Sequence, residues 1–161
     1  VHVMAGIAQG EEAEACFTDN LRYACAQAAP HGMNVLIEPL NTRDVPGYFL
    51  SDTAHALRLI DHVGSAALKI MYDCYHMQIM EGDLTRRCAE LLPHIGHIQF
   101  AGVPDRGRPD RGEVAFERLL PRLEDAGWAI PFGAEYKPGG PTEDSLGWLE
   151  SFKALSFPPR A

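Results

Sequence analysis

The chain has 161 residues, which is enough for one domain with a sizeable core, and 46% hydrophobic with 22% charged residues is typical of a globular protein. A net charge of -8 argues against nucleic acid or an anionic membrane surface as the partner. No apolar run approaches the ~20 residues of a transmembrane helix. The four cysteines form no Cys-x-x-Cys pair or disulfide framework, a pattern typical of reduced thiols in a cytoplasmic protein.

Short apolar runs alternate along the chain with stretches of helical periodicity. The runs are rich in Val, Ile, Leu, Phe and Tyr and are bounded by Gly, Pro, Asn or Asp, which is the pattern of buried strands. The sequence therefore predicts strands at 1–5, 34–40, 68–75, 97–101 and 130–136.

Helical spacing and end signals place a helix after each of these strands. Ser51 or Asp52 can cap the second helix, and Gly127 lies where the fourth would end. The tail at 157–159 is too rich in proline to be helical. The predicted helices are 11–29, 52–63, 83–92, 116–126 and 142–155.

Alternation of strands and helices predicts an α/β fold with a parallel sheet. No Gly-x-Gly-x-x-Gly motif follows a strand, and polar residues recur at the strand ends, so a (β/α)8 TIM barrel is favoured over an open doubly wound sheet. A barrel needs eight strands and ~250 residues. We therefore interpret residues 1–161 as a single domain that is a partial barrel, with about five βα units that correspond to strands 4–8.

Four polar side chains lie at the ends of four of these strands. Glu38, Asp73, Gln99 and Glu135 are separated by 35, 26 and 36 residues, close to one strand–helix unit each. Because the ends of parallel strands meet at one edge of a sheet, we expect these groups to converge. Three carboxylates and an amide oxygen are hard ligands that suit Mg²⁺ or Mn²⁺. The alternative is that each group serves a loop backbone or an ion pair.

Two carboxylates in one pocket can also move a proton between neighbouring carbons. Such general acid–base catalysis supplies ~10²–10⁴-fold in rate, which falls short of what proton removal beside a carbonyl requires. An electrophile must stabilise the enediolate, and a divalent metal or Lys137 can serve. The residues thus indicate carbonyl isomerisation or epimerisation, with no organic cofactor.

At these same positions the sequence resembles the hydroxypyruvate isomerases, a family of xylose isomerase-like TIM barrels. The resemblance is collinear over nearly the whole chain, and the Glu-Pro-Leu-Asn-x-Arg-Asp-x-Pro-Gly-Tyr motif is its most specific part. The segments that carry it are 36–50, 71–76, 96–104 and 135–138.

The resemblance implies an isomerase that interconverts hydroxypyruvate and 2-hydroxy-3-oxopropanoate (tartronate semialdehyde). It implies that Glu38 and Glu135 shuttle the proton, and that Glu38, Asp73, Gln99 and Glu135 occupy the family's metal positions. Many sugar-epimerase relatives have His at the position of Gln99, so a requirement for metal is the weaker part of this expectation.

The substrate would be a small anionic hydroxy-keto acid, which needs a fixed cation. Arg43 and Lys137 are the candidates, although each can instead pair with a neighbouring carboxylate. His76 can donate to a substrate oxygen, as the Asp-x-x-His element suggests, or pack within its loop. Three further arginines crowd the Gly/Pro loop at 102–112 and are interpreted as solvated surface charge, with a substrate lid as the alternative: Arg106, Arg108 and Arg111.

Two alternative functions remain open at this point. One is a ketose 3-epimerase of the same barrel superfamily, and the other is a non-catalytic fragment that binds a metal. The resemblance also implies that the first three strand–helix units of the family's barrel are absent here. The expected macromolecular partner is therefore a homo-oligomer or the missing N-terminal half-barrel.

Overall fold

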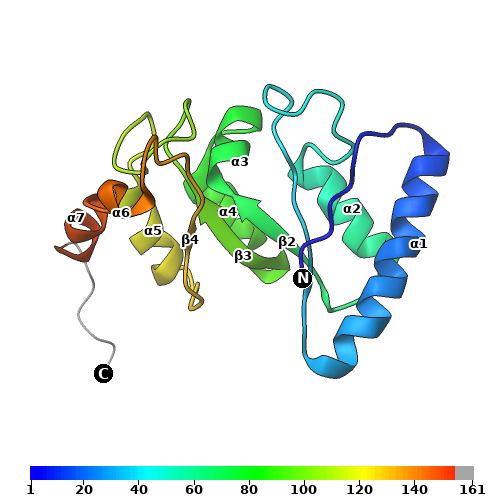
Figure 1. The fold of residues 1–161 in the computed structure, drawn as a ribbon. Coiled ribbons are helices and arrows are strands. Elements are labelled where there is room, and N and C mark those ends of the chain that lie inside the picture. Colours follow the sequence, from blue (N-terminus) through cyan, green and yellow to red (C-terminus); the bar gives the residue numbers. More distant parts are fainter. Residues whose placement is uncertain (155–161) are drawn as a thin grey trace.

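The computed structural model describes residues 1–154, and its four strands form one parallel sheet with helices packed along it (Figure 1). The strands follow one another in the sheet in the order of the sequence. This order requires a crossover through a helix between neighbours, as in the wall of a barrel. The strands are β1 (Val35–Ile37), β2 (Leu68–Asp73), β3 (Ile95–Phe100) and β4 (Gly133–Ala134).

The predicted strand at 1–5 is present only as a short parallel contact beside β1. His2 forms a single bridge with Leu36, the Val3 amide donates to the Leu36 carbonyl at 2.9 Å, and the Leu36 amide donates to the Val1 carbonyl at 2.7 Å. This N-terminal segment and β4 are thus the two outermost elements of the parallel array.

The helices pack on the sheet through apolar faces, as the periodicity predicts. Leu21 of α1, Leu59 of α2 and Phe116 of α5 are fully buried and pack with sheet residues such as Ile37 and Tyr72 in one continuous core. None of the helices in the described residues is long and apolar enough to cross a membrane. The helices are α1 (Glu11–Ala28), α2 (Thr53–Val63), α3 (Cys74–Met80), α4 (Leu84–Leu91), α5 (Phe116–Asp125), α6 (Thr142–Ser145) and α7 (Trp148–Ala154), with 3-10 turns η1 (Ala29–His31) and η2 (Leu92–His94).

The predicted last helix is divided into α6 and α7. The break falls at 146–147, where a glycine lowers helix propensity. The Ser145 hydroxyl donates to the Thr142 carbonyl at 2.6 Å and closes α6 as a single turn. The predicted end of this helix at 155 and the non-helical tail at 157–159 lie outside the described residues.

A helix that the sequence did not predict follows β2 directly. The predicted strand continues to residue 75, whereas β2 ends at Asp73 and α3 begins at Cys74. The Asp73 carboxylate accepts the Tyr75 amide at 2.9 Å and so caps α3. Asp52 caps α2 in the same way, through the His55 amide at 2.7 Å.

Strand register brings the polar strand ends level with one another. Asp73 lies opposite Gln99, and Gln99 lies opposite Gly133, two residues before Glu135. Neighbouring parallel strands are ~4.8 Å apart, so side chains at these positions share one end of the sheet.

Candidate functional site

A cavity of about 290 Å³ opens at the carboxyl end of the strands, where the sequence predicts the site. It contains three of the four predicted strand-end groups. Asp73 is 1% exposed and lies just beneath, in contact with His76 and Arg106 of the cavity wall. The lining residues are His2, Met4, Glu38, Leu40, Val45, Met71, His76, Gln99, Arg106 and Glu135.

Glu38 follows β1 and is the most deeply buried carboxylate that lines the cavity, at 5% exposure. Burial, together with the charges of Asp73 and Glu135, raises the pKa of Glu38 to about 8. Burial also raises the pKa of Asp73, to about 7. The site therefore gathers carboxyl groups whose ionisation is unfavourable, and a cation bound beside them would favour their ionised forms.

Arg106 supplies the cation that contacts this cluster. Its guanidinium lies 3.4 Å from the Asp73 carboxylate and forms a direct ion pair with Glu135. It also lies over the Tyr75 ring, 5.2 Å from the centroid. The interpretation of Arg106 as solvated surface charge is therefore wrong. Its backbone is in the left-handed region, with φ 55°.

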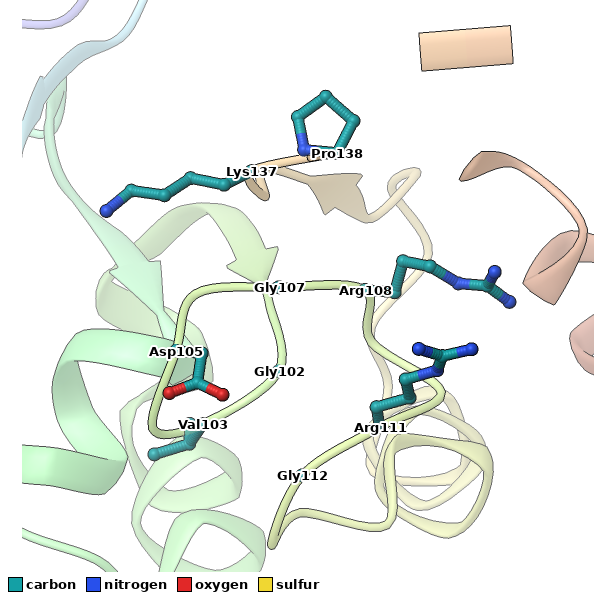
Figure 2. Close-up of a pocket in the computed structure, with 9 residues that line it drawn as sticks. All are labelled: Gly102, Val103, Asp105, Gly107, Arg108, Arg111, Gly112, Lys137 and Pro138. Atoms are coloured by element: carbon teal, nitrogen blue, oxygen red, sulfur yellow. The ribbon is translucent and has the colours of Figure 1, made fainter. Parts of the chain in front are cut away.

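The loop at 102–112 holds Arg106 in place through its own backbone. The loop borders a separate cavity of about 260 Å³, with Gly102 and Gly112 on its wall. Figure 2 shows the course of the loop past these residues. The Gly102 amide donates to the Gly107 carbonyl at 2.9 Å, and the Glu113 amide donates to the Val103 carbonyl at 3.0 Å. The loop is thus a packed unit that presents a side chain to the site.

Gly112→Ala should displace this loop. Gly112 has φ 113°, and an added Cβ would collide with the Val103 carbonyl oxygen. We expect the variant to lose about 1–3 kcal/mol of stability, since the strained backbone cannot relax without breaking the loop. Thermal denaturation of the chain measures the loss. Gly140→Ala is the matched control, because nothing lies within 4 Å of its added Cβ; equal melting temperatures for the two variants would contradict the argument.

The three predicted substrate-binding residues occupy different environments. His76 is 1% exposed and lines the site cavity, and burial lowers its pKa to about 4. Arg43 is exposed and does not line this cavity. Lys137 lines the loop cavity instead, and in Figure 2 its ammonium group points away from Arg108 and Arg111. The substrate roles of Arg43 and Lys137 stay predictions, and Arg106 lies closer to the predicted chemistry than either.

Sequence and structure comparisons identify the family. The xylose isomerase-like TIM barrel family matches residues 1–152. The chain belongs to this family. The α/β fold with its parallel sheet agrees with this family.

Several relatives in the xylose isomerase-like family carry isomerase names, which confirms the resemblance to hydroxypyruvate isomerases. The chain is 42% identical over 156 residues to a 2-oxo-tetronate isomerase of Cupriavidus necator, covering 94% of this chain and 60% of that protein. It is 42% identical over 143 residues to a hydroxypyruvate isomerase of Escherichia coli, covering 89% and 55%. The chain thus spans little more than half the length of these relatives.

The solved structures agree with this assignment. A structure from Brucella melitensis described as an AP endonuclease of family 2 superposes with a TM-score of 0.88 at 43% identity, over 93% of this chain and 59% of that one. A 3-keto-D-glucoside 4-epimerase of Escherichia coli superposes with a TM-score of 0.73 at 27% identity, over 86% and 54%.

The oxygen donors of this xylose isomerase-like site fit a hard divalent metal. Glu38, Asp73 and His76 each place a potential ligand atom within 4.8 Å of the others. Among the described residues, one Glu38 oxygen and the Gln99 amide oxygen are buried without a hydrogen-bond partner. Buried acceptors without donors cost free energy, and such oxygens are the ligand type that a hard divalent metal prefers.

Glu38→Gln should change how the stability of the metal-free chain depends on pH. A carboxyl whose pKa is about 8 when folded and 4.5 when unfolded stabilises the fold at acidic pH. That contribution is lost as pH rises toward 8, because the unfolded state then ionises more readily. The neutral amide does not ionise. We therefore expect the free energy of unfolding of the variant to exceed that of the wild type by about 1–3 kcal/mol at pH 8. Urea titrations at pH 5 and pH 8, in chelator, measure this, and a difference independent of pH would contradict it.

Proposed function

We propose that the chain forms strands 4–8 of an eight-stranded barrel whose activity is the isomerisation of a small hydroxy-keto acid, with hydroxypyruvate as the substrate. The observation that carries the proposal is that Glu38 and Glu135 line the same cavity. Glu38 follows β1 and Glu135 follows β4, the first and last strands of the sheet. A small molecule in that cavity therefore has a carboxylate on each side.

The reaction moves one proton between adjacent carbons. One carboxylate removes a proton from C3 of hydroxypyruvate, and the electron pair of that bond forms the enediolate. The other delivers a proton to C2, while the C3 hydroxyl proton moves to the oxygen on C2. The products are an aldehyde at C3 and a hydroxyl at C2, with no net loss of atoms or electrons. The relatives' names, hydroxypyruvate isomerase and 2-oxo-tetronate isomerase, support this substrate class.

The enediolate intermediate carries additional negative charge that must be stabilised within the cavity. The Arg106 guanidinium donates to the carboxylates of Asp73 and Glu135. In this proposal its remaining N–H groups donate to the substrate carboxylate or to the enediolate. A bound Mg²⁺ or Mn²⁺, held by Glu38, Asp73, Gln99 and Glu135, would supply further electrophilic stabilisation. In this proposal His76 donates a hydrogen bond to a substrate oxygen.

The test supplies the complete barrel with hydroxypyruvate, 2-oxo-tetronate and fructose in D₂O, and follows each by proton NMR. We expect hydroxypyruvate to convert to tartronate semialdehyde with deuterium appearing at C2. Conversion of fructose alone would favour a ketose 3-epimerase. Turnover of none of the three, together with calorimetric binding of Mn²⁺, would favour a non-catalytic metal-binding protein.

A further inference from the structure

Two hydrogen-bond donors converge on one nitrogen of the His76 ring. The main-chain amide of Asn41 donates to Nδ1 at 3.0 Å, and the side-chain Nδ2 of Asn41 lies 2.8 Å from the same atom. Both Asn41 and His76 are buried, at 0% and 1% exposure, so water does not compete for this contact.

The orientation of the Asn41 amide is fixed by its other contacts. The Asp44 main-chain amide can only donate, and it lies 2.8 Å from Oδ1 of Asn41, which identifies that atom as the oxygen. Nδ2 of Asn41 donates to the Asp44 carboxylate at 3.0 Å. The Tyr75 hydroxyl donates to the same Asp44 oxygen at 2.8 Å and holds that carboxylate in place. A flipped amide would bring two acceptors together at Asp44.

A neutral imidazole has one N–H donor and one lone pair. Because two donors face Nδ1, that nitrogen carries the lone pair and the proton lies on Nε2. Nε2 has no hydrogen-bond partner among residues 1–154. Its nearest carboxylate oxygens, on Asp73 and Glu38, are 3.7 and 3.9 Å away, too long for a hydrogen bond. The Nε2–H group is therefore buried, unpaired and beside the cavity.

We propose that Asn41 is a positioning residue that fixes His76 as the Nε2–H tautomer, so that His76 acts as a hydrogen-bond donor and does not ligate a metal. The donor's target, a substrate oxygen, rests on the proposed function; the tautomer does not. His76 is near enough to Glu38 and Asp73 to resemble a metal ligand, but its lone pair is directed at Asn41 and away from them. The unpaired Gln99 oxygen, which lines the same cavity, is a candidate further ligand.

The direct test is long-range ¹H–¹⁵N NMR of the chain labelled with ¹⁵N-histidine at neutral pH, in chelator. Protonated and unprotonated ring nitrogens have widely separated ¹⁵N shifts, so the tautomer is read from the spectrum, and His76→Gln identifies the resonances by their loss. We expect an unprotonated Nδ1 and a protonated Nε2. A protonated Nδ1 in the wild-type chain would overturn the proposal, whether or not the enzyme is active.

Asn41→Asp tests the role of the amide. The carboxylate would turn a donor at Nδ1 into an acceptor and face the Asp44 carboxylate, which favours a proton on Nδ1. We expect the His76 Nδ1 resonance to move toward the protonated shift. Asn20→Asp, on the exposed surface of α1, is the matched control and should leave the spectrum of His76 unchanged. An Asn41→Asp chain that melts like the wild type and keeps the wild-type His76 shifts would overturn the role of Asn41.

Measuring the activity of the complete barrel distinguishes the proposal about the His76 tautomer from the proposed function. If His76 donates to the substrate, Asn41→Asp should lower kcat/KM for hydroxypyruvate by about 10–100-fold, the value of one hydrogen bond to a charged group. A shifted tautomer with unchanged kcat/KM would leave the role of Asn41 intact and refute the donor role of His76 in the proposed reaction.

Discussion

Replacing Glu135 with Gln in the complete barrel is expected to lower kcat for hydroxypyruvate by about 10²–10⁴-fold, with KM changed only several-fold. Gln has the size of Glu and can still accept a hydrogen bond from Arg106, so the loop at 102–112 should stay in place. What is lost is the ability to take up or release a proton. Steady-state turnover and the rate of deuterium incorporation from solvent measure the two consequences separately.

Glu113→Gln is the matched control for this change. Glu113 is also a glutamate of the strand-end face, but it is exposed, bonded to Gln78 and outside the site cavity. It should retain wild-type turnover. Wild-type turnover in Glu135→Gln would refute the transfer of a proton by two carboxylates.

Arg106→Met should lower kcat/KM by about 10²–10³-fold and also destabilise the chain. Arg106 contacts Asp73, which is 1% exposed, and loss of the guanidinium leaves this carboxyl without its charged partner, at a cost of about 1–3 kcal/mol. Added Mg²⁺ or Mn²⁺ should recover part of the stability, because the metal would neutralise the same carboxylates. Kinetics of the complete barrel and thermal denaturation of the chain report the two effects.

Arg111→Met, in the same loop, controls for the loss of a positive charge. Arg111 lines the loop cavity and is exposed, and it contacts neither Asp73 nor Glu135. It should change kcat/KM less than twofold. If both variants retain the same kcat/KM, Arg106 has no part in binding or in catalysis.

The convergence of the polar strand ends was predictable from the sequence. Residues that end successive parallel strands lie at the same edge of the sheet, so a spacing of one strand–helix unit indicates neighbouring positions. Periodicity predicted the helices α1, α2, α4 and α5 to within a few residues. The spacing of the strand ends predicted that Glu38, Asp73, Gln99 and Glu135 would converge, and all of these except Asp73 line one cavity. These results depend on local apolar patterns, which the sequence displays directly.

What escaped prediction depends on contacts between distant segments. The stretch 74–80 contains Cys, Tyr, His and Ile, which suit a strand, and its helix is decided by the Asp73 cap. Arg106 lies in a Gly/Pro loop, where composition suggests solvent, yet its guanidinium contacts carboxylates at the ends of two strands. The contact between Asn41 and His76 spans 35 residues and has no signature in either local sequence.

Asp73 serves two purposes with its two oxygens. One accepts the Tyr75 amide that starts α3, and the other faces Arg106 and His76. Few substitutions at this position would keep both roles. Glu would be too long to cap the helix, and Ala would remove the cap as well as the charge. Asn would keep the helix cap while removing the negative charge, so the two purposes of this side chain can be separated by Asp73→Asn.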